Sequence, residues 1–369
     1  MDSTNKTGRT QGVGNLEREK WRWEQASPSV PVLLHHDRER FEVFLYSATQ
    51  TLDATTEWYR DEFRWRTLNH VPPPQFADGI RRDAIDILVD LSGHSKDNQL
   101  MTFVLKPAPV QVTAWGHALG TGLTAIDYLF SDAVVLPEAR RSRFAEAVVD
   151  LPSVVCFEPQ YPAPDIPPLP ERAPVFGAFH RLEKVSATTY DMWADVLRAV
   201  PAATLILKTP EFEEPMHRER VLKALTQRGV DARRLEIRGK TVHYEHLRQM
   251  ADCDLMLDTF PHNGGITTIE ALWMGVPVVT RQGQSIQSRL ASSFLTTLAL
   301  TRYITAGHAD YVACAVREIA DRAALAAYRA TARDGLLASP LCAHASYTRA
   351  VEEHYQRFWR TWCESSPSA

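Results

Sequence analysis

The sequence predicts an α/β protein built from two domains. The chain has 369 residues, which is enough for two domains of ordinary size, each with its own core. Short apolar segments typical of buried strands alternate with segments of helical periodicity, and the loops between them are short, as in parallel α/β domains. Seven prolines between residues 159 and 174 exclude helix and central strand there, so this segment is predicted to be an extended linker.

The first domain is expected to comprise residues 29–158. An N-terminal segment, 1–28, is polar and then charged, and is expected to be disordered or poorly ordered. After it the sequence predicts the end of a helix, a strand at 41–46, a helix at 78–84, a strand at 85–91, a helix at 98–106 and strands at 110–114 and 126–130. The segment 85–91, IDILVDL, is nearly continuously apolar, which is typical of a strand buried on both faces of a parallel sheet.

The second domain is expected at 175–342 and repeats the alternation. The sequence predicts strands at 175–179, 204–208, 235–238 and before Asp258, with helices at 188–200, 213–229, 243–251, 285–298, 309–320 and 322–337. An aromatic-rich helix at 346–362 is predicted in the remaining segment, 343–369.

The composition excludes several classes of function. The formal net charge is −4, so no global field favours nucleic acid or an anionic membrane. The five cysteines are scattered without a C-x-x-C pair, which suggests neither a disulfide framework nor a zinc site. The N-terminus lacks the apolar core of a signal peptide, and no run of about 18 apolar residues occurs. We therefore expect a soluble cytoplasmic protein that binds neither nucleic acid nor membranes.

The stretch from Cys253 to Thr280, CDLMLDTFPHNGGITTIEALWMGVPVVT, carries the strongest functional signal. Its pattern predicts a strand, a loop, a helix and a second strand. Gly264 and Gly265 let the backbone approach a ligand closely. Thr267 follows in the first turn of the helix, where unpaired N–H groups and the positive end of the helix dipole favour an anion such as a diphosphate. The alternative is structural, because Thr267 and Glu270 have the spacing of a capping box.

The string LDTFPHNGGITTIEALWMGVPVVT resembles the nucleotide-sugar loop of the O-linked N-acetylglucosamine transferase family, the SPINDLY-like glycosyltransferases. The resemblance implies that the segment from Gly264 to Thr267 holds the diphosphate of the donor and that Glu270 holds its ribose. Ile266 departs from the family, where a threonine or a similar small polar residue is expected. The contact at this position is retained if the family uses the backbone N–H and lost if it uses the hydroxyl.

A second stretch, KPAPVQV followed by GHALGTGLTAIDY, resembles the family segment in which a glycine loop lies over the sugar and the diphosphate. By itself such a loop is weak evidence. The resemblance implies that His117 and Gly120 contact the donor, with His117-Ala118 standing where the family has Tyr-Pro. His94 and His117 could act as acid or base, but a loop histidine is more often a structural hydrogen-bonding residue.

A third stretch, His180 to Lys184, resembles the family segment whose lysine reaches the diphosphate. The resemblance implies that Lys184 is catalytic, because its ammonium group would stabilise the negative charge that develops on the leaving nucleoside diphosphate. Arg181 replaces one of the family's amides and is expected to contact the substrate. The alternative for Lys184 is an ordinary solvated lysine.

The resemblance also implies which residues surround the nucleoside. His246, twelve residues before Asp258, matches the family histidine that contacts uracil. Thr241 would offer backbone groups to the base, and His243 takes the place of a lysine that contacts the ribose. Asp252-Cys253-Asp254 has the Asp-x-Asp pattern of metal-dependent glycosyltransferases, but it lies at a helix-to-strand junction, so no metal is expected.

The resemblance covers residues 29–362 and implies the GT-B fold, in which two Rossmann-like domains face each other across a cleft and a C-terminal helix packs back on the first domain. Family members have a strand and a loop with a histidine before the first helix, and no such segment is recognisable here. The first strand of a doubly wound sheet lies in its middle, so its loss would expose two rows of unpaired backbone groups. We therefore expect a first domain without its N-terminal strand, and a truncated chain with weakened activity or none.

The implied function is the inverting, metal-independent transfer of N-acetylglucosamine from UDP-N-acetylglucosamine to serine or threonine residues of a protein or peptide acceptor, without a cofactor. Tetratricopeptide repeats often precede the catalytic part in this family, but no self-similarity of about 34 residues is detectable here. Two alternatives remain open. One is a protein O-fucosyltransferase that uses a GDP sugar, and the other is a truncated pseudoenzyme that binds a nucleotide without turnover.

Overall fold

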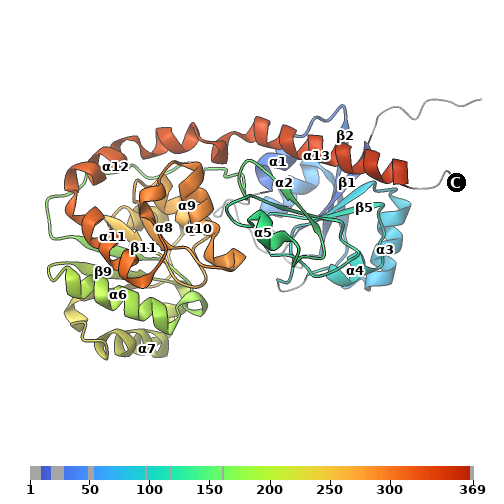
Figure 1. The fold of residues 1–369 in the computed structure, drawn as a ribbon. Helices are drawn as coiled ribbons and strands as arrows, with labels where there is room; N and C mark the ends of the chain where they lie inside the picture. Colours follow the sequence, from blue (N-terminus) through green and yellow to red (C-terminus); the bar gives the residue numbers. More distant parts are fainter. Residues whose placement is uncertain are drawn as a thin grey trace, which may run out of the picture. The chain divides into compact units, whose positions relative to one another are not determined.

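The computed structural model describes residues 10–17, 29–48, 54–95, 98–116, 119–159 and 162–365, which form two compact units. The N-terminal unit comprises the described residues up to Glu158 together with the C-terminal segment from Ala343 onward. The C-terminal unit comprises those from Pro159 to Cys342. Figure 1 shows that each unit is a sheet covered by helices.

The N-terminal unit is built on a seven-stranded parallel sheet with the strand order β3-β2-β1-β4-β5-β6-β7. Its strands are β1 (Thr10–Glu17), β2 (Phe41–Ser47), β3 (Arg64–Thr67), β4 (Ile87–Asp90), β5 (Val110–Thr113), β6 (Tyr128–Ser131) and β7 (Ala147–Asp150). Along β4 the side chains alternate between faces: Ile87 and Val89 pack into one apolar cluster, and Leu88 packs into another. Both faces are covered, which explains the continuous apolar sequence.

Helices cover both faces of this sheet (Figure 1). α13 (His344–Ser365) and α1 (Val30–His35) pack on the face that contains Ile87, and α3 (Pro73–Arg82) and α4 (Leu100–Val104) cover the face that contains Leu88. The buried residues of α13 recur at helical spacing and form one apolar stripe: Tyr347, Val351, Tyr355 and Phe358. α2 (Ala54–Glu62) and α5 (Glu138–Arg141) complete the unit.

The prediction that the first domain lacks its N-terminal strand is wrong. β1 pairs in parallel with β2 on one side and with β4 on the other, with Gly14 opposite both Phe44 and Leu88. Its sequence, TQGVGNLE, contains two glycines and has neither an apolar run nor a clear alternation, so the strand is hidden from pattern analysis. The two neighbouring strands supply hydrogen-bond partners on both sides, and this pairing outweighs the weak propensity. The expected loss of activity therefore no longer follows from a missing strand, and the activity of the chain stays a prediction.

The C-terminal unit is built on a six-stranded parallel sheet with the strand order β10-β9-β8-β11-β12-β13. Its strands are β8 (Val175–Ala178), β9 (Thr204–Lys208), β10 (Leu235–Arg238), β11 (Leu255–Leu257), β12 (Val278–Arg281) and β13 (Ile304–Thr305). The chain runs outward from β8 to β10 and then returns to place β11 on the other side of β8. The carboxyl ends of β8 and β11 therefore form the topological switch point of the sheet.

The helices of this unit are α6 (Ala187–Ala199), α7 (Pro215–Thr226), α8 (His243–Met250), α9 (Ile266–Trp273), α10 (Leu290–Thr297), α11 (His308–Ala320) and α12 (Arg322–Leu337). The proline-rich segment lies along α12, where Arg322 Nη2 donates a hydrogen bond of 2.7 Å to the Pro170 carbonyl oxygen. The predicted α/β class with two Rossmann-like units is confirmed.

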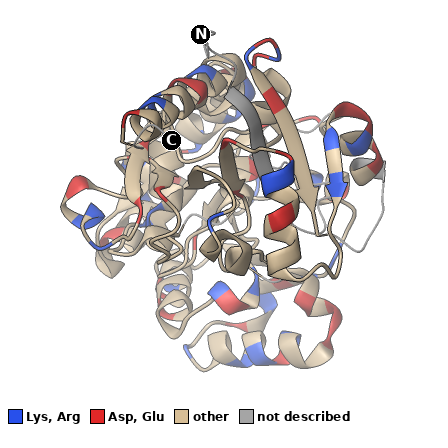
Figure 2. Ribbon diagram, turned by 90° about the vertical axis from the view of Figure 1, so that its right-hand side faces the viewer, with Lys and Arg blue, Asp and Glu red and all other residues tan. Residues whose placement is uncertain are grey.

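Acidic and basic residues are interspersed along the helices of the described part of the chain (Figure 2). This distribution accords with the small net charge of −4. No helix among the described residues combines the length and the apolar character that crossing a membrane requires.

Candidate functional site

Two loops meet at the switch point of the C-terminal sheet. β8 leads through His180 into a short 3₁₀ helix, η1 (Leu182–Lys184), and β11 leads through residues 258–265 into α9. A β-bridge between Val185 and Pro261 joins the two loops. Open α/β sheets bind their ligands at this position. Two of the predicted site segments, the one at Lys184 and the one that begins at Gly264, are therefore neighbours.

The segment 258–265, which we call the β11–α9 loop, is shaped by glycine. A side chain at Gly264 would collide with the Thr268 hydroxyl and would lie 3.4 Å from Asp258 Oδ1. Gly265 is the N-cap residue of α9, and the helix begins at Ile266 without a side-chain cap. The N–H groups in the first turn of a helix have no intrahelical partner, so those of Ile266 and Thr267 are available to an anion.

The capping-box alternative for Thr267 and Glu270 is wrong. Because α9 begins at Ile266, Thr267 is its second residue and Glu270 its fifth, which is too far along for reciprocal capping. Glu270 is buried, and its Oε1 lies 3.4 Å from Nε2 of His243, at the start of α8. Burial raises the pKa of Glu270 to about 7. The carboxyl group therefore faces His243 and does not cap the helix.

Lys184 reaches across to the β11–α9 loop. Its Nζ donates a hydrogen bond of 3.2 Å to the backbone carbonyl oxygen of Asn263. Burial lowers the pKa of Lys184, while the negative charge of Asp258 acts to raise it. An ammonium group has three N–H donors. Lys184 uses one of them for the neutral Asn263 carbonyl group, so it can still bind an anion at the start of α9.

The two residues before η1 differ in their surroundings. His180 is buried, and its Nε2–H donates to the Leu257 carbonyl oxygen at 3.2 Å. Burial lowers the pKa of His180 to about 3, so its ring is neutral at pH 7. Arg181, predicted to contact the substrate, has an exposed side chain with Nη1 3.7 Å from Glu183 Oε1.

The residues predicted for the nucleoside gather around the start of α8. The rings of His243 and His246 lie 6.0 Å apart in a stacked arrangement, and His246 also lies 5.5 Å from the ring of Phe179. Burial lowers the pKa of His246 to about 3, so this ring is neutral as well. The hydroxyl of Thr241 is buried without a hydrogen-bond partner among the described residues. A neutral ring and a buried hydroxyl are suited to recognising an uncharged heterocycle.

Sequence reasoning missed two charged residues of this site. Asp258 is fully buried and holds the β11–α9 loop through hydrogen bonds to its backbone. Lys208 is buried at the end of β9, its Nζ donates to the Gly239 carbonyl oxygen at 2.6 Å, and its charge helps to keep His246 neutral. The sequence does contain an indication for both: each is a charged residue at the end of an apolar run, where a strand of the sheet ends.

The glycine loop predicted to lie over the donor belongs to the N-terminal unit. His117 lies outside the described residues. Gly120 is closely packed, because a side chain there would lie 2.5 Å from the ring of Phe144. The loop is held by Glu146, whose Oε1 accepts from the Thr121 N–H at 2.6 Å, and by His94, whose Nε2–H donates to the Thr121 carbonyl oxygen at 2.9 Å. In this geometry His94 has the structural role that a loop histidine commonly has.

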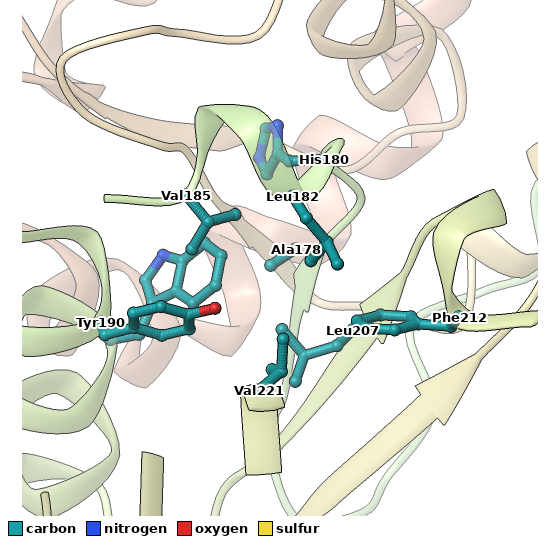
Figure 3. A pocket seen from close by; sticks show the side chains of 9 residues that line it. Ala178, His180, Leu182, Val185, Tyr190, Leu207, Phe212 and Val221 are labelled. Atoms are coloured by element: carbon teal, nitrogen blue, oxygen red, sulfur yellow. The ribbon is translucent and has the colours of Figure 1, made fainter. Parts of the chain in front are cut away.

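A small pocket lies next to η1, between β8, β9 and α6 (Figure 3). Its lining is mainly apolar and consists of Ala178, His180, Leu182, Val185, Tyr190, Trp193, Leu207, Phe212 and Val221. It has room for about one water molecule. It is therefore too small for a sugar or a nucleotide, and the open loops at the switch point remain the candidate site.

The carboxylates of the Asp-x-Asp sequence are engaged by arginines. Asp252 Oδ2 accepts from Arg238 at 2.6 Å, and Asp254 Oδ2 accepts from Arg172 at 2.8 Å. No cluster of three or more potential metal ligands occurs within the described ranges.

Comparison with known proteins identifies related sequences. The family model described as glycosyl transferase family 41 matches residues 26–157 and 165–351. A tomato (Solanum lycopersicum) protein named probable UDP-N-acetylglucosamine–peptide N-acetylglucosaminyltransferase SPINDLY is 34% identical over 342 residues, which cover 90% of this chain and 37% of that protein. The Arabidopsis thaliana protein of the same name is 33% identical with the same coverage. This chain thus spans 37% of the length of these curated relatives.

Solved structures are also similar. A point mutant of the O-GlcNAc transferase of Thermobaculum terrenum superposes with a TM-score of 0.92 at 33% identity, covering 97% of this chain and 69% of that one. The Anabaena protein HepE in complex with UDP has a TM-score of 0.59 at 14% identity, covering 94% of this chain and all of that one, and therefore shares the fold alone.

Proposed function

The chain belongs to glycosyl transferase family 41, and we propose that it transfers N-acetylglucosamine from UDP-N-acetylglucosamine to serine or threonine hydroxyls of a protein or peptide. The names of its relatives support the donor and the acceptor class. The five cysteines form no disulfide among the described residues, which favours the reducing cytoplasm as the location.

The observation that carries the proposal is the contact of Lys184 with Asn263 in the β11–α9 loop, just before the start of α9. The Lys184 ammonium group and the N–H groups of Ile266 and Thr267 would hold the diphosphate. When the bond to the sugar breaks, negative charge grows on the leaving UDP, and these groups stabilise it without a metal ion. The contact at Ile266 uses its backbone N–H, so the departure from threonine is tolerated.

The remaining residues of the C-terminal unit would bind the nucleoside. Glu270 and His243 would accept and donate hydrogen bonds at the ribose hydroxyls, and Thr241 and the neutral ring of His246 would contact the base. The acceptor hydroxyl would attack the anomeric carbon from the side opposite UDP, which inverts the configuration. The hydroxyl gives up its proton to a general base as the new bond forms.

A transfer assay with purified chain and peptide libraries tests the proposal. UDP-N-acetylglucosamine and GDP-fucose are compared as donors, and transfer is read by peptide mass. A mass increase of one N-acetylhexosamine that withstands peptide N-glycosidase supports the proposal. Fucose transfer from the GDP sugar contradicts the assigned donor, and binding of UDP without turnover of any donor contradicts the enzymatic function.

A further inference from the structure

Asp258 sits at the centre of a network that links three elements of the C-terminal unit. Its Oδ1 accepts from the N–H groups of Thr259 at 2.8 Å and Gly264 at 2.7 Å, the two ends of the β11–α9 loop. Its Oδ2 accepts from the Thr280 hydroxyl at 2.6 Å, on the adjacent strand β12. The carboxylate therefore fixes both ends of the loop to the sheet.

The N-terminal unit contains the same arrangement. Asp90 ends β4, as Asp258 follows β11, and each of these strands lies directly beside the first strand of its unit, β1 or β8. Asp90 accepts from the N–H groups of Ser92 at 3.0 Å and Gly93 at 3.0 Å, and from the Thr113 hydroxyl at 2.8 Å. Thr113 lies on the next strand outward, β5, as Thr280 does on β12. Two independent sheets thus place a carboxylate and a threonine at equivalent positions under a glycine-containing loop.

Burial of a carboxylate is not a general means of stabilising a fold. Asp258 and Asp90 are both fully buried, and burial raises the pKa of each. Apolar residues at such positions often give equal or greater stability, whereas buried polar networks define one arrangement of the chain. The cost of burying Asp258 is therefore better explained by the loop geometry that it imposes.

We propose that Asp258 is the positioning residue for the diphosphate of a nucleoside diphosphate donor. The Asp258 carboxylate accepts a hydrogen bond from the Gly264 N–H. This contact orients the N–H groups in the first turn of α9 toward the ligand. The negative charge of Asp258 also favours the ammonium form of Lys184. A side chain at Gly264 would collide with the Thr268 hydroxyl, so this close approach of the loop to α9 requires glycine. This inference rests on the proposed function.

The experiment compares binding of UDP and of uridine by titration calorimetry or ligand-observed NMR. Uridine lacks the diphosphate. A change at a residue that positions the phosphate-binding N–H groups should therefore lower the affinity for UDP and leave the affinity for uridine unchanged. The variants are Asp258→Asn, which removes the charge and keeps an acceptor, and Thr280→Val and Thr280→Ser, which remove and keep the hydroxyl. Asp254→Asn is the matched control, because Asp254 is equally buried but precedes β11 at its opposite end.

We expect Asp258→Asn to weaken UDP binding about 10-fold to 100-fold, with the affinity for uridine changed less than about twofold. Thr280→Val follows in the same direction, Thr280→Ser restores the affinity, and Asp254→Asn changes neither ligand. Equal losses of UDP and uridine affinity, or unchanged UDP affinity in folded Asp258→Asn, overturn the inference. If the unaltered chain does not bind UDP, the proposed function itself fails, which is a distinguishable result.

Discussion

At the scale of single residues, the site combines groups whose charge states are set by burial. Two rings, those of His180 and His246, are kept neutral, while the Lys184 ammonium group is supported by the Asp258 carboxylate. The resemblance to the family predicted the places of Lys184 and His246 in the chain. It did not point to Asp258 or Lys208, because their importance lies in contacts that only the folded chain shows: Asp258 accepts from Thr280 on the neighbouring strand, and Lys208 donates to Gly239.

Lys184→Ala tests the main electrostatic contribution. We expect the turnover number to fall about 10²-fold to 10³-fold, as for the loss of a preorganised donor at a developing charge. Lys223→Ala, at an exposed lysine on α7, is the control and should change turnover less than about twofold, which is about the scatter of such assays. Equal activity of Lys184→Ala and the unaltered chain in steady-state kinetics would show that this lysine does not stabilise the leaving group.

The buried carboxyl group of Glu270 should make stability depend on pH. Its pKa is raised from 4.5 to about 7, so the neutral form is preferred in the folded state. The stability that it contributes is fully present below about pH 4.5 and is lost as pH rises through 7. Glu270→Gln has no such ionisable group, so its free energy of unfolding does not fall in this way. Between about pH 4.5 and 8, the free energy of unfolding of the variant minus that of the unaltered chain should rise by up to about 3 kcal/mol.

Urea unfolding of both proteins across this pH range measures the difference. A difference that does not change with pH would contradict the prediction.

At the scale of elements, pattern and pairing contribute differently to prediction. The strand–loop–helix–strand sequence from Cys253 to Thr280 was readable because apolar runs and glycines mark its boundaries. β1 cannot be predicted from its sequence, because its residues have weak strand propensity. Its position in the sheet is set by pairing with β2 and β4 on either side. The start of α9 agrees with the prediction that Thr267 lies in the first helical turn, whereas the capping-box alternative fails because its spacing alone does not fix where a helix begins.

Gly264 allows a direct test of the β11–α9 loop. Gly264→Ala brings a methyl group against the Thr268 hydroxyl, so the loop must shift, and UDP affinity should fall about 10-fold or more. Thr268→Ala in the same chain removes the obstructing hydroxyl and should restore part of the affinity. A double-mutant cycle by calorimetry measures this coupling.

The control is Gly335→Ala in α12, where an added methyl group meets no neighbour within 4 Å. This change should leave UDP affinity unaltered and raise stability by up to about 1 kcal/mol, because alanine favours the helix. Additive effects of Gly264→Ala and Thr268→Ala would show that the close approach has no influence on binding.

At the scale of the whole molecule, the chain consists of two Rossmann-like units. Each contains a buried aspartate that accepts a hydrogen bond from a threonine on the neighbouring strand. The predicted GT-B fold class is confirmed by the TM-score of 0.92 to the Thermobaculum O-GlcNAc transferase mutant. The alternation of strands and helices made the class predictable from sequence. The pairing of Asp90 with Thr113 and of Asp258 with Thr280 was not predictable, because a one-residue pattern carries no information about which strands become neighbours.

The most direct test of the account is a crystal structure of the chain with UDP. The account predicts that the diphosphate lies within hydrogen-bond distance of Lys184 Nζ and of the Ile266 or Thr267 backbone N–H, with the ribose beside Glu270. A nucleotide bound away from the carboxyl ends of β8 and β11, or a diphosphate without contact to Lys184 and α9, would contradict it.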